Sequence, residues 1–344
     1  MAFWTEGAFY SLTPLQCPTP MCSKAPVLPG RSVNTAPYDG VMSELIDLHT
    51  HSTASDGSDS PGEVIAAAAK AGIHTVALTD HDTVSGWAEA TEAATALDVG
   101  LIPGIELSTQ VFDEDNGFEP HSVHLLGYLI DPTHPQLVEE MAKIRSHRDN
   151  RLQMMVEKLA KDFPISWLEV RAGIPDGATP GRPHIAEVLI AKGIVKDTTE
   201  AFQHILAGDG PYHVPHYAPT LETGIRIIRE AGGVPVLAHP LSRGGTPLTD
   251  VRGPVEEAVT RYQRWWELGL MGVELHHREN VPEQRPALEE VAGTLGLIVT
   301  GSSDYHGSKK PNPLGEHTTT PEALREILER SSGVRPIGAM PAGV

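Results

Sequence analysis

The feature that most constrains the fold of this chain is an alternation of short apolar runs with helix-like segments. Residues 45–48 lead into His49 and residues 234–238 lead into His239; both runs have the length and composition of buried strands. Between such runs lie patterns such as residues 61–71, which begin with proline, continue through alanines and predict a helix. Strands and helices that alternate along a chain are typical of a parallel α/β architecture.

Seven such apolar runs occur, and six carry polar, ligand-type residues at or near their carboxyl ends. Because the loops after the strands build the site in (β/α) barrels, this arrangement favours a barrel over an open sheet. Residues 132–219 interrupt the alternation of strands and helices: they contain one long helical pattern and three shorter ones. We therefore predict a disordered N-terminal extension (1–41), a first barrel part (42–131), a small inserted helical subdomain (132–219), a second barrel part (220–325) and a C-terminal tail (326–344).

The composition excludes several classes of partner. The formal net charge of the 344 residues is −19, which argues against binding to long DNA, because such binding needs many Lys and Arg side chains against phosphates. No window approaches about 18 consecutive apolar residues, so we predict no membrane span. The only cysteines, Cys17 and Cys22, lie in the N-terminal extension, which excludes a disulfide scaffold elsewhere. We expect a cytoplasmic protein that is a monomer or a weak oligomer.

Histidines and carboxylates recur at the predicted strand ends. His49 and His51 stand two apart, so strand alternation puts both imidazoles on one face, and Asp56 follows in a Gly/Ser turn that can fold back over them. One such pair is weak evidence, but buried strands rarely end in charged groups unless these are paired or bind metal. The whole set exceeds the needs of one tetrahedral ion and predicts two or three divalent ions. The predicted ligands are His49, His51, Asp56, His81, Glu106, His124, His239, Asp304 and His306.

Two histidine assignments have alternatives. His121 lies three residues before His124; we choose His124 because it belongs to the apolar run HLLGY, whereas His121 borders an irregular loop. His276 is a candidate for protonating a leaving group. The alternative is that His276 and His277 form a polar strand end at the rim of the barrel.

The order HxH…D…TDHD…GxE…H…AHP…SDxH resembles the PHP (polymerase and histidinol phosphatase) superfamily. The resemblance extends from Glu44 to about Pro321, and the combined motifs are specific although each fragment alone is not. It implies a distorted seven-stranded (β/α) barrel of PHP type with a trinuclear site for Mn, Fe or Zn. We expect manganese first, with two or three ions per chain.

Carried over residue by residue, the resemblance implies three ion sites. Asp80 and Asp82 would orient the metal-binding side chains without binding an ion themselves. Asp304, Glu106 and His306 would be the residues central to catalysis. The three implied sets are His49, His51 and Asp304 with Glu106 bridging; Glu106, His124 and His239; and Asp56, His81 and His306.

The helical insert and the TDHDT signature are similar to the bacterial 3′,5′-nucleotide bisphosphate phosphatases and to related 5′→3′ exoribonucleases acting on short RNA. The resemblance therefore implies a hydrolase that removes the 3′-phosphate of nucleoside 3′,5′-bisphosphates. The alternatives are cleavage of short 5′-phosphorylated RNA and, more distantly, a histidinol-phosphatase-like activity on another small phosphomonoester. The amidohydrolases also begin with H-x-H, but no predicted strand end offers the lysine that bridges their ions.

A substrate with a second phosphate needs a basic clamp. Arginine suits this task because its planar guanidinium donates two parallel hydrogen bonds to phosphate. The alternative for each candidate is a solvated side chain on a helix or loop. The predicted phosphate-binding residues are Arg148, Arg182, His184 and Arg243.

Overall fold

The computed structural model describes residues 44–113, 119–208, 210–215, 217–242, 246, 248–341 and 344. The predicted extension 1–41 and the predicted phosphate contact Arg243 lie outside these residues. The strands are β1 (Leu45–Thr50), β2 (Ile73–Leu78), β3 (Gly100–Asp113), β4 (Glu119–Tyr128), β5 (Val234–Leu237), β6 (Gly272–His276) and β7 (Ile298–Gly301). The α-helices are α1 (Pro61–Lys70), α2 (Trp87–Leu97), α3 (Pro135–Leu159), α4 (Trp167–Ala172), α5 (Arg182–Ala191), α6 (Thr198–His204), α7 (Leu221–Glu230), α8 (Val255–Glu267), α9 (Arg285–Leu295) and α10 (Pro321–Arg330).

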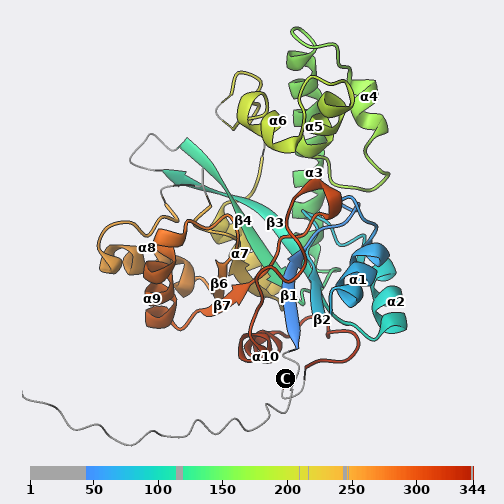
Figure 1. Cartoon of the computed structure of the whole chain (residues 1–344). Helices are drawn as coiled ribbons and strands as arrows, with labels where there is room; N and C mark the ends of the chain where they lie inside the picture. The colour runs from blue at the N-terminus through green and yellow to red at the C-terminus, as the bar shows by residue number, and fades with distance from the viewer. Residues whose placement is uncertain are drawn as a thin grey trace, which may run out of the picture. The chain divides into compact units, whose positions relative to one another are not determined.

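The seven strands of the described chain form one sheet in sequence order, from β1 to β7 (Figure 1). This confirms the predicted α/β fold, but the expectation of parallel strands throughout is wrong for β4. That strand runs antiparallel to both β3 and β5, because β3 and β4 pair as a hairpin where a helical crossover was expected. β3 consequently continues to Asp113, so Glu106 lies within the strand and not at its end.

One apolar cluster of the sheet is formed by buried side chains from six of the strands and from α10. A bridge between Thr50 and Tyr305 links the end of β1 to the segment after β7; closure by a continuous ladder stays a prediction. α10 contributes Leu324 and Ile327 and spans the boundary that we expected at 325/326. The strand residues of this cluster include Leu48, Ala77, Ile102, Leu126, Val236 and Ile298.

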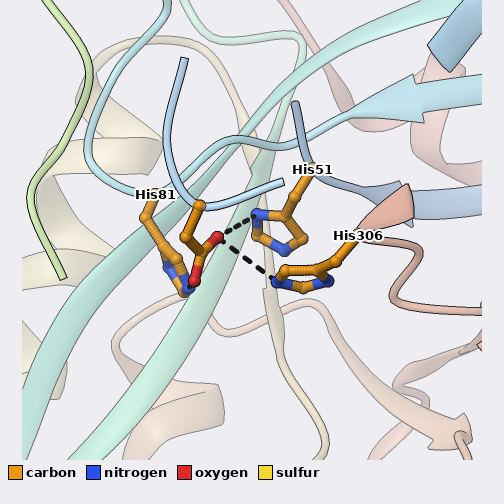
Figure 2. A group of neighbouring side chains, drawn as sticks. His51, His81 and His306 are labelled. Carbon is orange, nitrogen blue, oxygen red and sulfur yellow. Dashed lines mark ion pairs between the residues drawn. The ribbon is translucent and has the colours of Figure 1, made fainter. Parts of the chain in front are cut away.

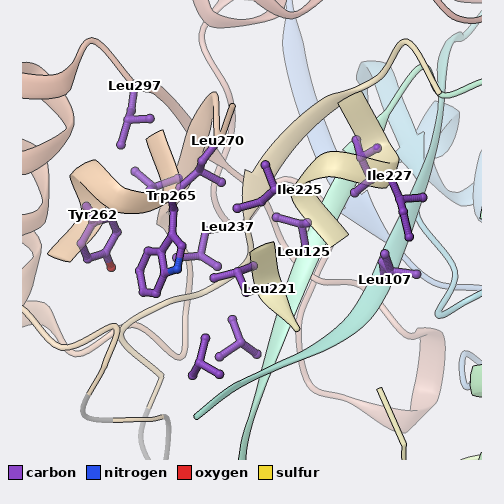
Figure 3. Close-up of a cluster of buried hydrophobic side chains, with 14 of the residues drawn as sticks. Leu107, Leu125, Leu221, Ile225, Ile227, Leu237, Tyr262, Trp265, Leu270 and Leu297 are labelled. Carbon is purple, nitrogen blue, oxygen red and sulfur yellow. The ribbon is translucent and has the colours of Figure 1, made fainter. Parts of the chain in front are cut away.

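The helices form where caps and apolar periodicity agree. α1 opens with a reciprocal capping box, in which the Ser60 hydroxyl accepts from the Glu63 amide and the Glu63 carboxylate accepts from the Ser60 amide. α7 buries one face against β3 and β4 (Figure 3). At Gly224 a Cβ would lie 2.7 Å from the Thr109 methyl group, so only glycine allows this close approach.

The helical insert has an apolar core of its own and shares α3 with the sheet. The first half of α3 places Met141 and Ile144 in the core beside the sheet. Its second half places Met155 and Leu159 in a separate cluster with α4, α5 and α6, which gather around this end of α3 (Figure 1). The predicted domain boundaries themselves stay a prediction. In the described part of the chain, no helix combines the length and apolar character needed to cross a bilayer.

Candidate metal centre

Glu106 lies at the middle of a group of imidazoles that come from four different strands or the turns after them. Its carboxylate is 1% exposed, and its Oε2 lies 3.2 Å from Nε2 of both His49 and His51. The same oxygen lies 3.1 Å from His81 Nδ1. Its Oε1 lies 2.8 Å from the Nδ1 of His124 and 3.1 Å from the Nε2 of His239. A single carboxylate with this many nitrogen neighbours is suited to bridge cations.

A second group surrounds Asp56, in the turn after β1. Its Oδ1 lies 3.3 Å from His306 Nε2 and 3.7 Å from His51 Nδ1, and its Oδ2 lies 3.8 Å from His81 Nε2. Figure 2 shows how the imidazoles of His51, His81 and His306 lie in this group. Each of the four side chains offers one ligand atom, and the four atoms lie within 4.8 Å of one another.

Asp304 forms a third group, just past β7. Its Oδ1 lies 3.3 Å from His51 Nε2 and 3.6 Å from His49 Nε2. Its Oδ2 accepts a hydrogen bond of 2.7 Å from the Lys310 ammonium. The two oxygens of one carboxylate thus face different surroundings, with imidazoles on one side and a cation on the other.

The backbone is strained at three site residues. Asp82, His239 and Asp304 have φ angles of 54°, 28° and 54°, in the left-handed region that non-glycine residues rarely adopt. Such conformations persist where the surrounding structure enforces them, and they concentrate at functional sites.

Burial and the neighbouring charges shift the pKa values of the central groups in different directions, with those of His81 and His306 lowered. Burial alone would raise the pKa of Glu106, but His81, His124 and His49 outweigh burial and hold it well below its ordinary value. Burial likewise disfavours a charged His51, yet hydrogen bonds to Asp304 and Glu106 raise the pKa of His51 to about 9. Protons therefore occupy part of this site in the absence of another cation, and metal binding would release them.

The donor set fits divalent metal ions. His81 Nδ1 and His124 Nδ1 lie within 3.1 Å of Glu106 oxygens, yet neither forms a hydrogen bond with any residue in the described ranges. His306 Nε2 is likewise buried without such a partner. Close nitrogen and oxygen atoms that are not hydrogen bonded to one another are the arrangement that a shared ion satisfies. All nine predicted ligands meet here; their assignment as ligands stays a prediction.

Sequence reasoning missed Glu274 and considered His277 only as part of a polar strand end at the rim, but both residues are buried. Glu274 accepts a hydrogen bond from His49 Nδ1 at 3.0 Å and another from the His239 amide at 2.9 Å. His277 is fully buried near Asp304, whereas His276, the residue that we considered for the leaving group, is exposed. A carboxylate inside the otherwise apolar run of β6 was the signal that could have identified Glu274, because buried charges are usually paired or bind metal.

Asp80 and Asp82 support the centre differently from our expectation. Among the described residues, neither carboxylate lies within 4.0 Å of an imidazole nitrogen. Asp80 instead accepts hydrogen bonds from Ser52 and Ser55 in the turn before Asp56. Asp82 accepts from the amide and hydroxyl of Ser108.

Three of the four predicted phosphate contacts lie in the helical insert, which meets this centre through Arg148 and Asp82. Arg148 makes an ion pair with Asp82, with Nε 2.9 Å from Oδ2, and donates to Ser108 Oγ. Arg182 donates to the Leu206 carbonyl at 2.9 Å, and His184 is 2% exposed. These contacts occupy part of each arginine and leave further N–H groups on both guanidiniums.

Comparisons with known proteins identify the family. The protein-family model described as the PHP domain matches residues 47–163. The 3′,5′-nucleoside bisphosphate phosphatase of Chromobacterium violaceum is 31% identical over 268 residues, which covers 76% of this chain and 87% of that protein. The chain belongs to the PHP family. This confirms the resemblance found in its motifs.

Two further relatives place the chain within the PHP family. The 5′-3′ exoribonuclease Rnm of Escherichia coli is 35% identical over 198 residues, which covers 57% of this chain and 65% of that protein, slightly less than two thirds. The crystal structure of a predicted metal-dependent phosphoesterase from Bifidobacterium adolescentis shares 38% identity with a TM-score of 0.75, covering 83% of this chain and 96% of that one. The PHP chain is thus a metal-dependent phosphoesterase, and therefore a hydrolase.

Proposed function

We propose that this protein removes the 3′-phosphate of nucleoside 3′,5′-bisphosphates. The observation that carries the proposal is the buried Glu106 carboxylate with imidazoles of five histidines around it, adjoining the Asp56 and Asp304 groups. Ions bound there would activate water near neutral pH and neutralise charge that develops on the phosphoryl group. Manganese is our first choice, and the predicted site holds two or three ions.

The protein's own residues prepare this centre. Glu274 accepts a hydrogen bond from His49 Nδ1, which leaves Nε2 as the nitrogen that faces Glu106. The Asp304 carbonyl accepts from His306 Nδ1 at 2.8 Å and frees His306 Nε2 in the same way. With Nδ1 engaged in this way, Nε2 is the nitrogen of each imidazole that would bind an ion.

A clamp for the second phosphate would come from the helical insert. The amide of Thr179 donates to the Ala54 carbonyl at 3.0 Å, which joins the segment before Arg182 to the turn that carries Asp56. Burial lowers the pKa of Arg182, and repulsion from the nearby Arg148 guanidinium lowers it further. A dianionic phosphate would relieve this repulsion, which supports Arg148, Arg182 and His184 as the clamp.

The second candidate is stepwise 5′→3′ cleavage of short 5′-phosphorylated RNA. The similarity to the Escherichia coli exoribonuclease favours it. Both activities would use the same ions and the same grip on a 5′-phosphate, so one site could serve both.

The test measures products from Mn-loaded protein with adenosine 3′,5′-bisphosphate and, in parallel, with a 5′-phosphorylated RNA trimer. Inorganic phosphate from the first substrate, abolished in Asp304→Ala, supports the phosphatase. Mononucleotides from the trimer support the exoribonuclease. If neither substrate reacts under Mn, Fe or Zn, the proposed substrate class is wrong.

The clamp is tested with adenosine 3′-monophosphate, which lacks the second phosphate. Because a hydrogen bond to a charged group contributes about 1.5–3 kcal/mol, Arg182→Ala should lower kcat/KM for the bisphosphate roughly 10- to 100-fold. It should leave kcat/KM for the monophosphate almost unchanged. Arg171→Ala is the matched control, because it removes another guanidinium that donates to a carbonyl of the same insert. An equal loss on both substrates would refute the clamp.

A further inference from the structure

His277 lies where a further metal ligand would be expected. It follows β6 directly, and its side chain is 0% exposed. Its ring centre lies 5.1 Å from that of His239 and 6.2 Å from that of His49. By distance alone, His277 forms a possible ion site with His49 and Asp304.

The backbone around His277 argues against a ligand role. The amide of Glu279 donates to His277 Nδ1 at 3.1 Å, and an amide can only be a donor. Nδ1 must therefore present its lone pair to that amide, and the ring hydrogen lies on Nε2. His49 and His306 have the opposite arrangement, since their Nδ1 atoms face a carboxylate and a carbonyl oxygen. The nitrogen of His277 that faces the centre thus carries a hydrogen and no free lone pair.

The nearest acidic acceptor of that hydrogen is Asp304. His277 Nε2 lies 3.7 Å from Asp304 Oδ2, the oxygen that also accepts from Lys310. His277 Nε2 has no hydrogen-bond partner among the described residues, and a buried donor left without one is costly. About 0.7 Å of side-chain movement would bring the two atoms to hydrogen-bond distance.

We propose that His277 is a hydrogen-bond donor to Asp304 at this centre, and not a further metal ligand. Together with Lys310, it donates to Oδ2 of Asp304. The other oxygen, Oδ1, faces His49 and His51 and is therefore the one that would bind an ion. His277 is therefore a positioning residue for the metal centre. This inference rests on the proposed function only in that the centre binds divalent ions.

The test counts bound Mn ions per chain and measures their affinity by chelator competition, which does not depend on turnover. His277→Leu removes the donor at similar volume, and His277→Gln keeps an N–H donor while removing the imidazole. His239→Leu and His239→Gln are the matched controls, because His239 Nε2 faces Glu106 at 3.1 Å and is a predicted ligand. Circular dichroism checks that each variant is folded.

We expect His277→Leu to bind as many ions as the wild type, with affinity weakened about 10-fold or more, as is usual for groups that orient ligands. His277→Gln should restore most of the affinity, whereas both His239 variants should lose bound metal. Loss of an ion in both His277 variants would overturn the proposal, as would unchanged affinity in His277→Leu. If His277→Leu does not fold, the ion count of His277→Gln decides. A wild-type chain that binds no ions would instead refute the metal centre itself.

Discussion

Replacing Arg148 with methionine tests whether the ion pair between α3 and the loop after β2 stabilises the protein. Arg148 Nε lies 2.9 Å from Asp82 Oδ2, and the side chains are 11% and 0% exposed. Removal of one partner of a buried pair typically costs about 3–5 kcal/mol, because the other charge stays buried. The two hydrogen bonds from Ser108 to Asp82 would remain, so we expect a loss near the lower limit, about 3 kcal/mol.

The assay is thermal unfolding of substrate-free protein, followed by circular dichroism. An unfolding entropy of about 2.1 cal/mol/K per residue gives about 1.6 °C per kcal/mol for the roughly 300 residues that the structure describes, so Arg148→Met should lower the Tm by roughly 5 °C. The same substitution in an Asp82→Asn background should cost much less, because no buried charge is left unpaired. A Tm within 1 °C of the wild type would show that the ion pair with Asp82 adds no stability. An equal loss in both backgrounds would show that Arg148 stabilises the protein through other contacts.

Three further predictions concern the metal centre and its border. Glu274→Gln should weaken metal affinity about 10-fold in chelator competition, because His49 Nδ1 loses its carboxylate; unchanged affinity would exclude Glu274 as an orienting group. Stripping the metal with a chelator should lower the Tm, and Mn at about 100 times its Kd should restore about 2.7 kcal/mol; equal Tm values would mean that the metal does not bind the folded state preferentially. Burial, aided by Lys309, lowers the pKa of His184, so its protonation opposes folding: this cost is absent above pH 6.5 and grows as the pH falls below that value. Denaturant unfolding at pH 7.5 and 5.5 should therefore show a smaller loss of stability for His184→Gln than for the wild type, and identical losses would contradict this reasoning.

Local patterns in the sequence were sufficient for most of the secondary structure. The helix expected at residues 61–71 is α1, because Ser60, Pro61 and Glu63 satisfy its first turn without help from distant residues. The direction of β4 could not be predicted in this way. Strand alternation shows which residues share a face, but it does not show which strand lies alongside or in which direction it runs.

The same division applies to the candidate site. The H-x-H pair at His49 and His51, and the carboxylates near strand ends, are local features that indicated metal chemistry before any fold was known. Only the tertiary structure revealed that Glu274 contacts His49 across 225 residues of sequence, that His277 is buried beside Asp304, and that Arg148 faces Asp82. The tautomer of an imidazole and the partner of a guanidinium depend on atoms brought near by folding. A residue's type and spacing carry no information about those atoms.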